Sequence, residues 1–327
     1  MSVELEILTE SAERLFANHV TPELFQSVEA GEWPDALWRA VTAAGFERAE
    51  MPVVGATVSR VAGRHAAPIP LPETMLVASL LEEAGLAVPE GALSIAPSVI
   101  TIDAGGALSG TARHVPWARH APHMAVICNN DTLALVETAR AQISLGQNLA
   151  GEPRDEVCLD GVTAVQTAEG VSHASVQEQA ALLRVAQIAG ALEKILSLTV
   201  QYAGERRQFG RPIAKFQAVQ HHLAALAGHT AAACAALEAA ADAPDFLAVA
   251  SAKACASEAA GEAAAIAHQV HGAIGFTEEH ALHRYTKALW AWREEFGNEA
   301  EWNSRLGAHV AALGGDGLWP AITGSGG

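Results

Sequence analysis

Two short segments of this chain contain the residues best suited to hold an anionic or aromatic ligand. The first, residues 202–213, reads Tyr-Ala-Gly-Glu-Arg-Arg-Gln-Phe-Gly-Arg-Pro-Ile and follows a long apolar stretch. Arg206 presents a planar fork of donors that can pair with two phosphate oxygens, and Phe209 can pack on a planar heterocycle. The same residues also suit a helix C-terminus, where arginines interact with the helix dipole and Gly210 ends the last turn.

The second segment, residues 269–276, reads Gln-Val-His-Gly-Ala-Ile-Gly-Phe. Glycines such as Gly272 and Gly275 let a ligand approach the backbone closely, and exposed N–H groups at such a turn can receive a phosphate. A simple glycine-rich turn between two helices would have the same sequence. Taken alone, the segment leaves both interpretations open.

Considered together, the two segments resemble the flavin-contacting half of the acyl-CoA dehydrogenase family. The family pattern is Arg, two residues, Phe-Gly, then a Gln, followed further along the chain by Gln-x-x-Gly-Gly-x-Gly-Phe. This chain departs from the pattern at Ala273, which replaces the second glycine of the later motif. The resemblance implies that the diphosphate and adenosine end of FAD is contacted by Arg206, Phe209, Gly210, Gln217, Gln269, His271 and Gly272.

The catalytic base of that family is missing from both of its usual positions. Removal of a proton from an acyl Cα needs a carboxylate in a dry pocket. The positions that match the family glutamate are occupied here by Phe296, directly before Gly297, and by Ala180. We therefore predict no catalytic residue in this chain, although a shift of the loop by one residue would present Glu295 as an unusual base. Glu178 is a poor substitute for a base at position 180, because two helical steps turn it about 200° away.

The family's middle-domain loop, Thr/Ser-Glu-Pro-x-x-Gly-Ser-Asp, is also missing. The nearest string is Gly151-Glu152-Pro153, which lacks the Gly-Ser-Asp that should follow. The resemblance therefore implies a non-catalytic subunit, similar to that of the mixed α2β2 acyl-CoA dehydrogenases of steroid side-chain breakdown. In such a hetero-oligomer a catalytic partner subunit supplies the base and binds most of the acyl-CoA, so this chain is active only with that partner.

Two alternatives stay open. The first is a homo-oligomeric acyl-CoA dehydrogenase in which Glu295 is the base. The second is a structural scaffold subunit that keeps the fold for assembly and binds no flavin. Flavin in the isolated chain would favour the first alternative, and a colourless complex would favour the second.

The pattern of elements resembles the architecture of the same family. Residues 1–91 show helical periodicity with a proline-rich break at residues 68–72. Residues 92–168 contain β-type runs at 98–102, 124–128 and 133–136, separated by turn signals. Residues 169–327 are helical again, and we expect their glycine-rich end from Gly314 onward to fray. The predicted fold is mainly α with a small, shortened β domain: an N-terminal helical domain, a middle antiparallel β-sheet or barrel, and a C-terminal four-helix bundle.

Bulk composition narrows the possible function classes. The 327 residues are 50% hydrophobic and 17% charged, which is typical of a globular chain with a sizeable core. The net charge of −17 argues against nucleic-acid partners, which require a basic face. The four cysteines lack zinc-site spacing, so we predict no metal site and expect the cysteines to be small buried hydrophobic residues.

The acidic start is not typical of a signal peptide, and we find no apolar stretch of about 18 residues with membrane character. A cytoplasmic location is therefore expected.

Overall fold

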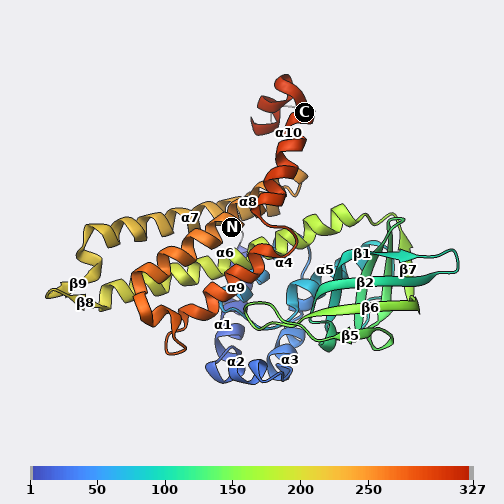
Figure 1. Cartoon of the computed structure of the whole chain (residues 1–327), viewed down its shortest axis with the longest axis horizontal. Helices are drawn as coiled ribbons and strands as arrows, with labels where there is room; N and C mark the ends of the chain where they lie inside the picture. The colour runs from blue at the N-terminus through green and yellow to red at the C-terminus, as the bar shows by residue number, and fades with distance from the viewer. Residues whose placement is uncertain (1–2, 324–327) are drawn as a thin grey trace.

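The computed structural model describes residues 3–323, and Figure 1 shows helices at both ends of the chain with a sheet between them. The first helices are α1 (Val3–His19), α2 (Pro22–Glu29), α3 (Asp35–Ala43), α4 (Val53–Arg64) and α5 (Leu71–Glu83), with the 3-10 turn η1 (Phe46–Arg48) before α4. The start of α2 is encoded locally. The Thr21 hydroxyl accepts the N–H of Leu24 at 3.4 Å, and Pro22 occupies the first helical position.

Helix α4 lies within residues 1–91, which the periodicity predicts to be helical, although Gly55 and Gly63 lower its helix propensity. The structure gives Gly63 a packing role against α6 (His173–Glu205). A Cβ at Gly63 would lie 2.2 Å from the carbonyl oxygen of Gln187, and a Cβ at Gly190 would lie 1.8 Å from that of Arg60. The two helices therefore cross with their backbones in contact, which fixes the N-terminal helices on the C-terminal ones.

The middle of the chain forms a seven-stranded sheet with the order β5-β6-β2-β1-β3-β4-β7. Its strands are β1 (Leu93–Ile102), β2 (Ala107–Pro116), β3 (His123–Cys128), β4 (Thr132–Glu137), β5 (Gln142–Ser144), β6 (Arg154–Thr163) and β7 (Gln166–Glu169), and the 3-10 turns η2 (Ala118–His120) and η3 (Thr138–Arg140) connect them.

The predicted antiparallel pairing is wrong in one place, because β1 and β3 are parallel neighbours. The chain leaves β1 for β2 on one side and crosses back through η2 to the other side of β1. Sequence alternation does not reveal such a crossover, since a strand has the same periodicity in either direction.

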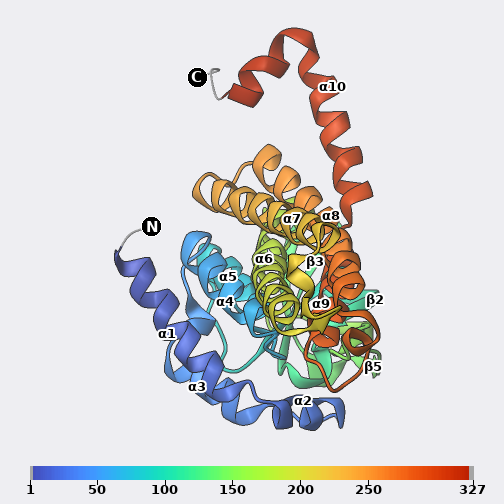
Figure 2. The same cartoon turned by 90° about the vertical axis from the view of Figure 1, so that its left-hand side faces the viewer.

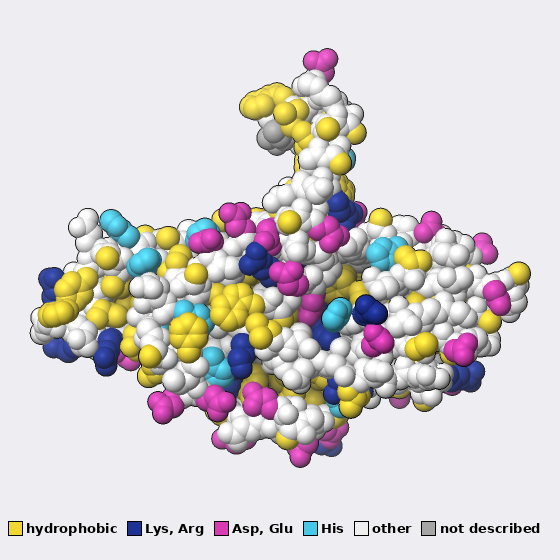
Figure 3. Space-filling view, viewed as in Figure 1, with side chains coloured by type: hydrophobic (Ala, Val, Ile, Leu, Met, Phe, Trp, Pro, Cys, Tyr) yellow, Lys and Arg dark blue, Asp and Glu magenta, His cyan; other side chains and the backbone are white. Residues whose placement is uncertain are grey.

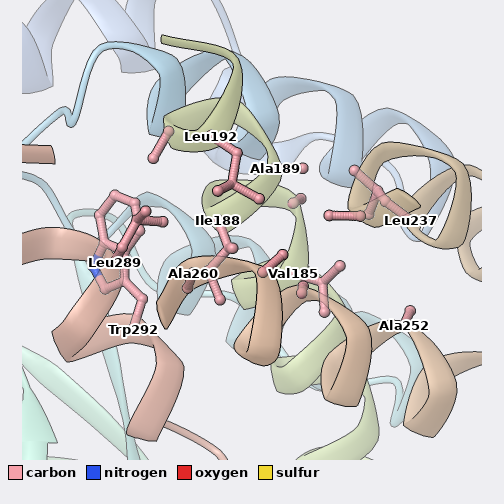
Figure 4. Packing of buried hydrophobic residues seen from close by; sticks show 14 of the residues in the cluster. Val185, Ile188, Ala189, Leu192, Leu237, Ala252, Ala260, Leu289 and Trp292 are labelled. Atoms are coloured by element: carbon pink, nitrogen blue, oxygen red, sulfur yellow. The ribbon is translucent and has the colours of Figure 1, made fainter. Parts of the chain in front are cut away.

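The C-terminal region is a bundle of α6, α7 (Gln217–Asp242), α8 (Phe246–His271) and α9 (Leu282–Glu294), followed by α10 (Glu299–Thr323). Its core is shown in Figure 4, where side chains of α6 meet those of the other three helices. The labelled residues are Val185, Ile188, Ala189, Leu192, Leu237, Ala252, Ala260, Leu289 and Trp292. The many alanines at this junction let the helices approach closely, because alanine has a high helix propensity and little bulk. The predicted fold class is confirmed.

Two expectations for this region are wrong. The first is that the chain contains no apolar stretch of about 18 residues: helix α7 is long and apolar enough, by length and composition alone, to cross a membrane. Only 28% of its most apolar window is buried within the chain. The end of the chain is not frayed from Gly314, because α10 continues through Thr323 with a kink where Gly314 adopts φ 68°. The rest of the segment expected to fray, residues 324–327, lies outside the described residues. Figures 1 and 2 show α10 extending away from the body of the molecule.

All four cysteines are free, and only Cys128 is fully buried. Cys158, Cys234 and Cys255 are partly exposed, so the expectation of burial is wrong for these three. Burial still raises the pKa of the Cys128 and Cys255 thiols and raises that of Cys234 to about 11. These three thiols therefore stay protonated near neutral pH, which keeps them poor nucleophiles.

Candidate functional site

The first sequence motif folds into a short hairpin beyond the end of α6. In it β8 (Arg207–Gln208) pairs with β9 (Arg211–Pro212), and η4 (Ile213–Lys215) leads into α7. The two turn residues have positive φ angles, 51° at Phe209 and 79° at Gly210, as type I′ hairpins require. A non-glycine residue rarely adopts this conformation, and Phe209 is also 92% exposed. An exposed ring held in a strained turn suggests a contact outside the chain.

Arginines without carboxylate partners surround this hairpin. Arg206, Arg207 and Arg211 are exposed, and none of them forms an ion pair within residues 3–323. The Arg211 guanidinium lies 4.3 Å from the centre of the Phe216 ring, close enough for a cation–π contact. Figure 3 shows Lys and Arg side chains gathered at the end of the molecule where Figure 1 places β8 and β9. In a chain of net charge −17, this end is a local cationic surface suited to phosphate.

The second motif forms the turn η5 (Gly272–Phe276) between α8 and α9. Gln269 and Gly272 are exposed, as is Gln217 at the start of α7. Gly272 has φ 65°, and a Cβ added there would meet no atom within 4 Å. A ligand can therefore approach the backbone at this turn.

His271 joins the two motifs from a buried position. It is 3% exposed, its Nδ1 donates to the Ala267 carbonyl at 2.8 Å, and its ring stacks on Tyr202 with centroids 4.4 Å apart. The Tyr202 hydroxyl donates to the His271 carbonyl at 3.2 Å, so the ends of α6 and α8 are held together. Burial lowers the pKa of His271, which favours the neutral ring. This geometry fixes the orientation of the ring, and the cofactor contact expected of His271 from the sequence stays a prediction.

The two positions that lack a base converge in space. Ala180 on α6 and Phe296 after α9 line one cavity of about 10 Å³, together with Glu73 and Arg184. Such a cavity holds roughly one water molecule. The Phe296 ring lies 5.5 Å from the Arg184 guanidinium. An aromatic ring and a methyl group therefore stand where the family would place a carboxylate.

Glu295 is the centre of a buried ion-pair cluster. Its Oε1 accepts from Arg154 Nε at 2.8 Å, and its Oε2 lies 2.7 Å from Arg184 Nη2. Asn148 Nδ2 donates to the same Oε1 at 3.1 Å. Burial opposes ionisation, but the two arginines outweigh it and lower the pKa of Glu295 to about 2. A general base works best with a pKa near the operating pH, so this environment argues against Glu295 as the base.

Two more carboxylates complete the cluster. Glu73 lies 2.6 Å from Arg184, and Glu152 lies 3.0 Å from Arg154. Glu152 also accepts the indole N–H of Trp292 at 3.1 Å. The cluster joins α5, α6, the loop before β6 and the end of α9. The Glu152-Pro153 string is thus part of a junction between the sheet and the helices.

Lys253 fixes the segment that carries Glu295 and Phe296. Its Nζ donates to the carbonyls of Arg293 at 2.8 Å and Gly297 at 2.7 Å, and to the Ser257 hydroxyl at 3.0 Å. Lys253 is fully buried, and this burial lowers its pKa to about 7. Sequence reasoning misses this residue, because a lysine in an alanine-rich helix normally faces solvent.

A second cavity lies between β1, the first turns of α6 and the Phe296–Gly297 segment. Its volume is about 160 Å³, and its lining includes Ile95, Pro97 and His173. Small-molecule pockets usually enclose about 300–1,000 Å³. The space next to Phe296 is therefore small for a ring system with an acyl chain.

Comparison with known proteins identifies similar chains. The family description "Acyl-CoA dehydrogenase, C-terminal domain" matches residues 174–299. Acyl-CoA dehydrogenase IpdE2 of Mycobacterium tuberculosis is 30% identical over 306 residues, which cover 87% of this chain and 90% of that protein. IpdE2 of Mycolicibacterium smegmatis is 29% identical over 334 residues, covering 95% of this chain and 100% of that protein.

Solved structures share the whole fold. A variant of the Tcur3481–Tcur3483 steroid ACAD superposes with a TM-score of 0.87 at 26% identity, covering 94% of this chain and 98% of that chain. The ChsE4–ChsE5 complex from Mycobacterium tuberculosis has a TM-score of 0.85 at 22% identity, covering 95% of this chain and 98% of that chain. At that identity the second comparison shows the fold alone.

Proposed function

Because this chain belongs to the acyl-CoA dehydrogenase family, we propose that it is the non-catalytic subunit of a heteromeric FAD-dependent acyl-CoA dehydrogenase. The family consists of FAD-dependent flavoproteins. One contrast supports the subunit role most strongly. The arginines around β8 and β9 are exposed and unpaired, whereas Ala180 and Phe296 close a cavity of about 10 Å³ where a base would stand.

The chain's residues fit the nucleotide end of FAD. Arg206 would donate to the diphosphate, and the exposed Gln217 and Gln269 would donate further hydrogen bonds. Gly272 leaves the backbone of η5 open to a phosphate or sugar. Phe209 extends far enough from the body to pack on a planar ring in a site shared with a neighbouring subunit. When bound, the flavin supplies the hydride acceptor.

The chain's residues fit the reactive end of the cofactor poorly. The ion pairs of Glu295 tie up the carboxylate that directly precedes Phe296, and the adjacent cavity of about 160 Å³ is small. A catalytic partner subunit would therefore supply the base and most of the acyl-CoA site. The similarity to the Tcur3481–Tcur3483 steroid ACAD supports a hetero-oligomer, which we propose to be α2β2, and a steroid side-chain CoA ester as the substrate class.

The test is to produce this chain together with the acyl-CoA dehydrogenase chain encoded beside its gene and to measure flavin absorbance. Arg206→Ala should weaken flavin retention by the complex about tenfold or more, because a hydrogen bond to a charged group contributes about 1.5–3 kcal/mol. Arg113→Ala is the control, since Arg113 is an exposed arginine on β2, with a side chain 76% exposed, that pairs with Glu156. Equal flavin retention by both variants, or a colourless wild-type complex, would refute the proposed cofactor contacts.

A further inference from the structure

Helix α7 presents an uncharged face that nothing in the described chain covers. Residues 217–237 contain no Asp, Glu, Lys or Arg, although the chain carries a net charge of −17. Between residues 224 and 235 the exposed positions are all small: Ala224, Ala225, Gly228, Ala231, Ala232 and Ala235. A Cβ added at Gly228 would meet no atom within 4 Å. Such a face lets another helix approach closely, and a large uncharged patch of this kind marks an interaction surface.

A groove runs beside this face. It lies between α7, α6 and α4, has a volume of about 620 Å³, and its lining includes Leu196, Ala227, Ala231, Arg60 and Arg64. The lining is mixed, because Glu193 and Lys194 also contribute to it and both arginines pair with Glu193. Its apolar part, which includes Leu196, can contact a large side chain. The two guanidinium groups suit an aromatic one, because arginine packs well on aromatic faces.

The same chain carries an apolar arm, residues 303–323 of α10. Its root is anchored by Trp302, which is fully buried and donates its indole N–H to the Phe296 carbonyl at 2.9 Å. Beyond it, Leu313 is 37%, Leu318 36% and Trp319 70% exposed, and only Arg305 and Asp316 are charged. The arm projects on the side of the body where α7 lies in both views (Figures 1 and 2). A single exposed helix is marginal in water, so an arm of this composition needs a surface to lie on.

We propose that the arm of one copy lies along the uncharged face of α7 in a second copy of this chain, with Trp319 in the groove beside Ala231. One chain contains both halves of this contact, large apolar side chains on the arm and small ones on α7. A two-fold axis between two copies would therefore form this contact twice, with each arm lying on the α7 of the other copy. Because residues 217–237 carry no charged side chain and residues 303–323 carry only Arg305 and Asp316, two strongly acidic chains can meet there with few like charges facing each other.

The area is sufficient for a stable contact. The arm bends at Gly314, so it offers two segments of about ten residues, each ~15 Å long and ~10 Å wide. If one segment lies on the α7 face and the other in the groove beside it, the two reciprocal contacts would bury four surfaces of ~300 Å² each. The total of ~1,200 Å² reaches the lower limit of specific, stable interfaces. This interface is separate from the β8–β9 hairpin, so it extends the proposed function without depending on bound flavin.

The test compares the copy number of this chain per particle, measured by analytical ultracentrifugation of the chain with its co-purified partner and of the chain alone. We expect two copies in the wild type and one in either Ala231→Glu or Trp319→Glu, with no further loss in the double variant. Ala17→Glu, on the exposed side of α1, is the control and should keep two copies. Helical circular dichroism and flavin per copy should stay unchanged in all variants, which separates this result from any failure of the cofactor contacts.

Cross-linking identifies the occupant of the α7 face. Two differently tagged copies are produced together, one with Ala231→Cys and the other with Trp319→Cys, and are oxidised. We expect a product that contains both tags, above the level given by the native cysteines alone. A single copy per wild-type particle, or a cross-link from position 231 to the partner subunit instead, would overturn the assignment. It would also be overturned if wild type sedimented with phosphatidylcholine–phosphatidylglycerol vesicles and Ala231→Glu did not, because a membrane would then cover α7.

Discussion

Replacing Glu295 with Gln separates a structural carboxylate from a catalytic one. The substitution keeps the shape of the side chain and removes the charge that faces Arg154 and Arg184, whose side chains are both 2% exposed. Breaking a buried ion pair by removing one partner typically costs about 3–5 kcal/mol. The lowering of the Glu295 pKa from 4.5 to about 2 corresponds to about 3 kcal/mol by linkage. The typical cost of breaking a buried ion pair and the cost worked from the pKa shift therefore agree on a loss of about 3 kcal/mol in the free energy of unfolding.

Urea unfolding at pH 7 measures this loss, and turnover per bound flavin in the co-purified complex measures catalysis. We expect turnover of the folded Glu295→Gln complex to stay within about twofold of wild type. Glu294→Gln is the control, because its side chain is 60% exposed and surface substitutions usually change stability by less than about 0.5 kcal/mol. General-base catalysis contributes about 10²–10⁴-fold. A loss of that size in Glu295→Gln, with stability unchanged, would refute the structural role and restore Glu295 as the base.

Three further outcomes follow from the structure. The wild-type free energy of unfolding should fall as pH drops from about 4.5 to about 2, because the unfolded Glu295 carboxyl takes up its proton first; Glu295→Gln should lack this part of the decrease in urea unfolding at stepped pH. The pKa of Lys253 is lowered from 10.5 to about 7, so the unfolded chain binds more protons between these values and stability should rise with pH there; Lys253→Met should flatten that slope in the same assay. Gly190→Ala should destabilise the chain by about 3 kcal/mol or more, since its Cβ would lie 1.8 Å from a backbone oxygen. Gly204→Ala, with open space around it, should instead stabilise α6 by up to about 1 kcal/mol. Thermal unfolding measures both variants, and equal effects would contradict the packing argument.

Local signals in the sequence predict the elements that depend on local chemistry. The cap at Thr21, the helix break before α5 and the strong β runs of β3 and β4 are visible in the sequence, because capping, proline geometry and β-branched residues act over a few positions. Contacts between distant segments are not visible in the sequence. The close crossing of α4 and α6 at Gly63 and Gly190 is one example, and the parallel pairing of β1 and β3 is another.

The candidate site also contains some features that the local sequence predicts and others that depend on distant contacts. The arginine hairpin and the η5 turn are contiguous motifs, so their residues can be recognised in the sequence before their exposure is known. The cluster of Glu73, Arg154, Arg184 and Glu295 gathers residues that are far apart in the chain. Its members look like ordinary surface charges in the sequence. The burial of His271 likewise depends on Tyr202, which is distant in sequence.

The most direct test of the division of labour between two chains is the flavin content of this chain with and without its partner, followed by addition of an acyl-CoA thioester. We predict that the chain purified alone is colourless and inactive. With the partner, we predict one flavin per copy of this chain, bleached when the thioester is added. A flavin-containing preparation of this chain alone that is bleached by the thioester would contradict the account.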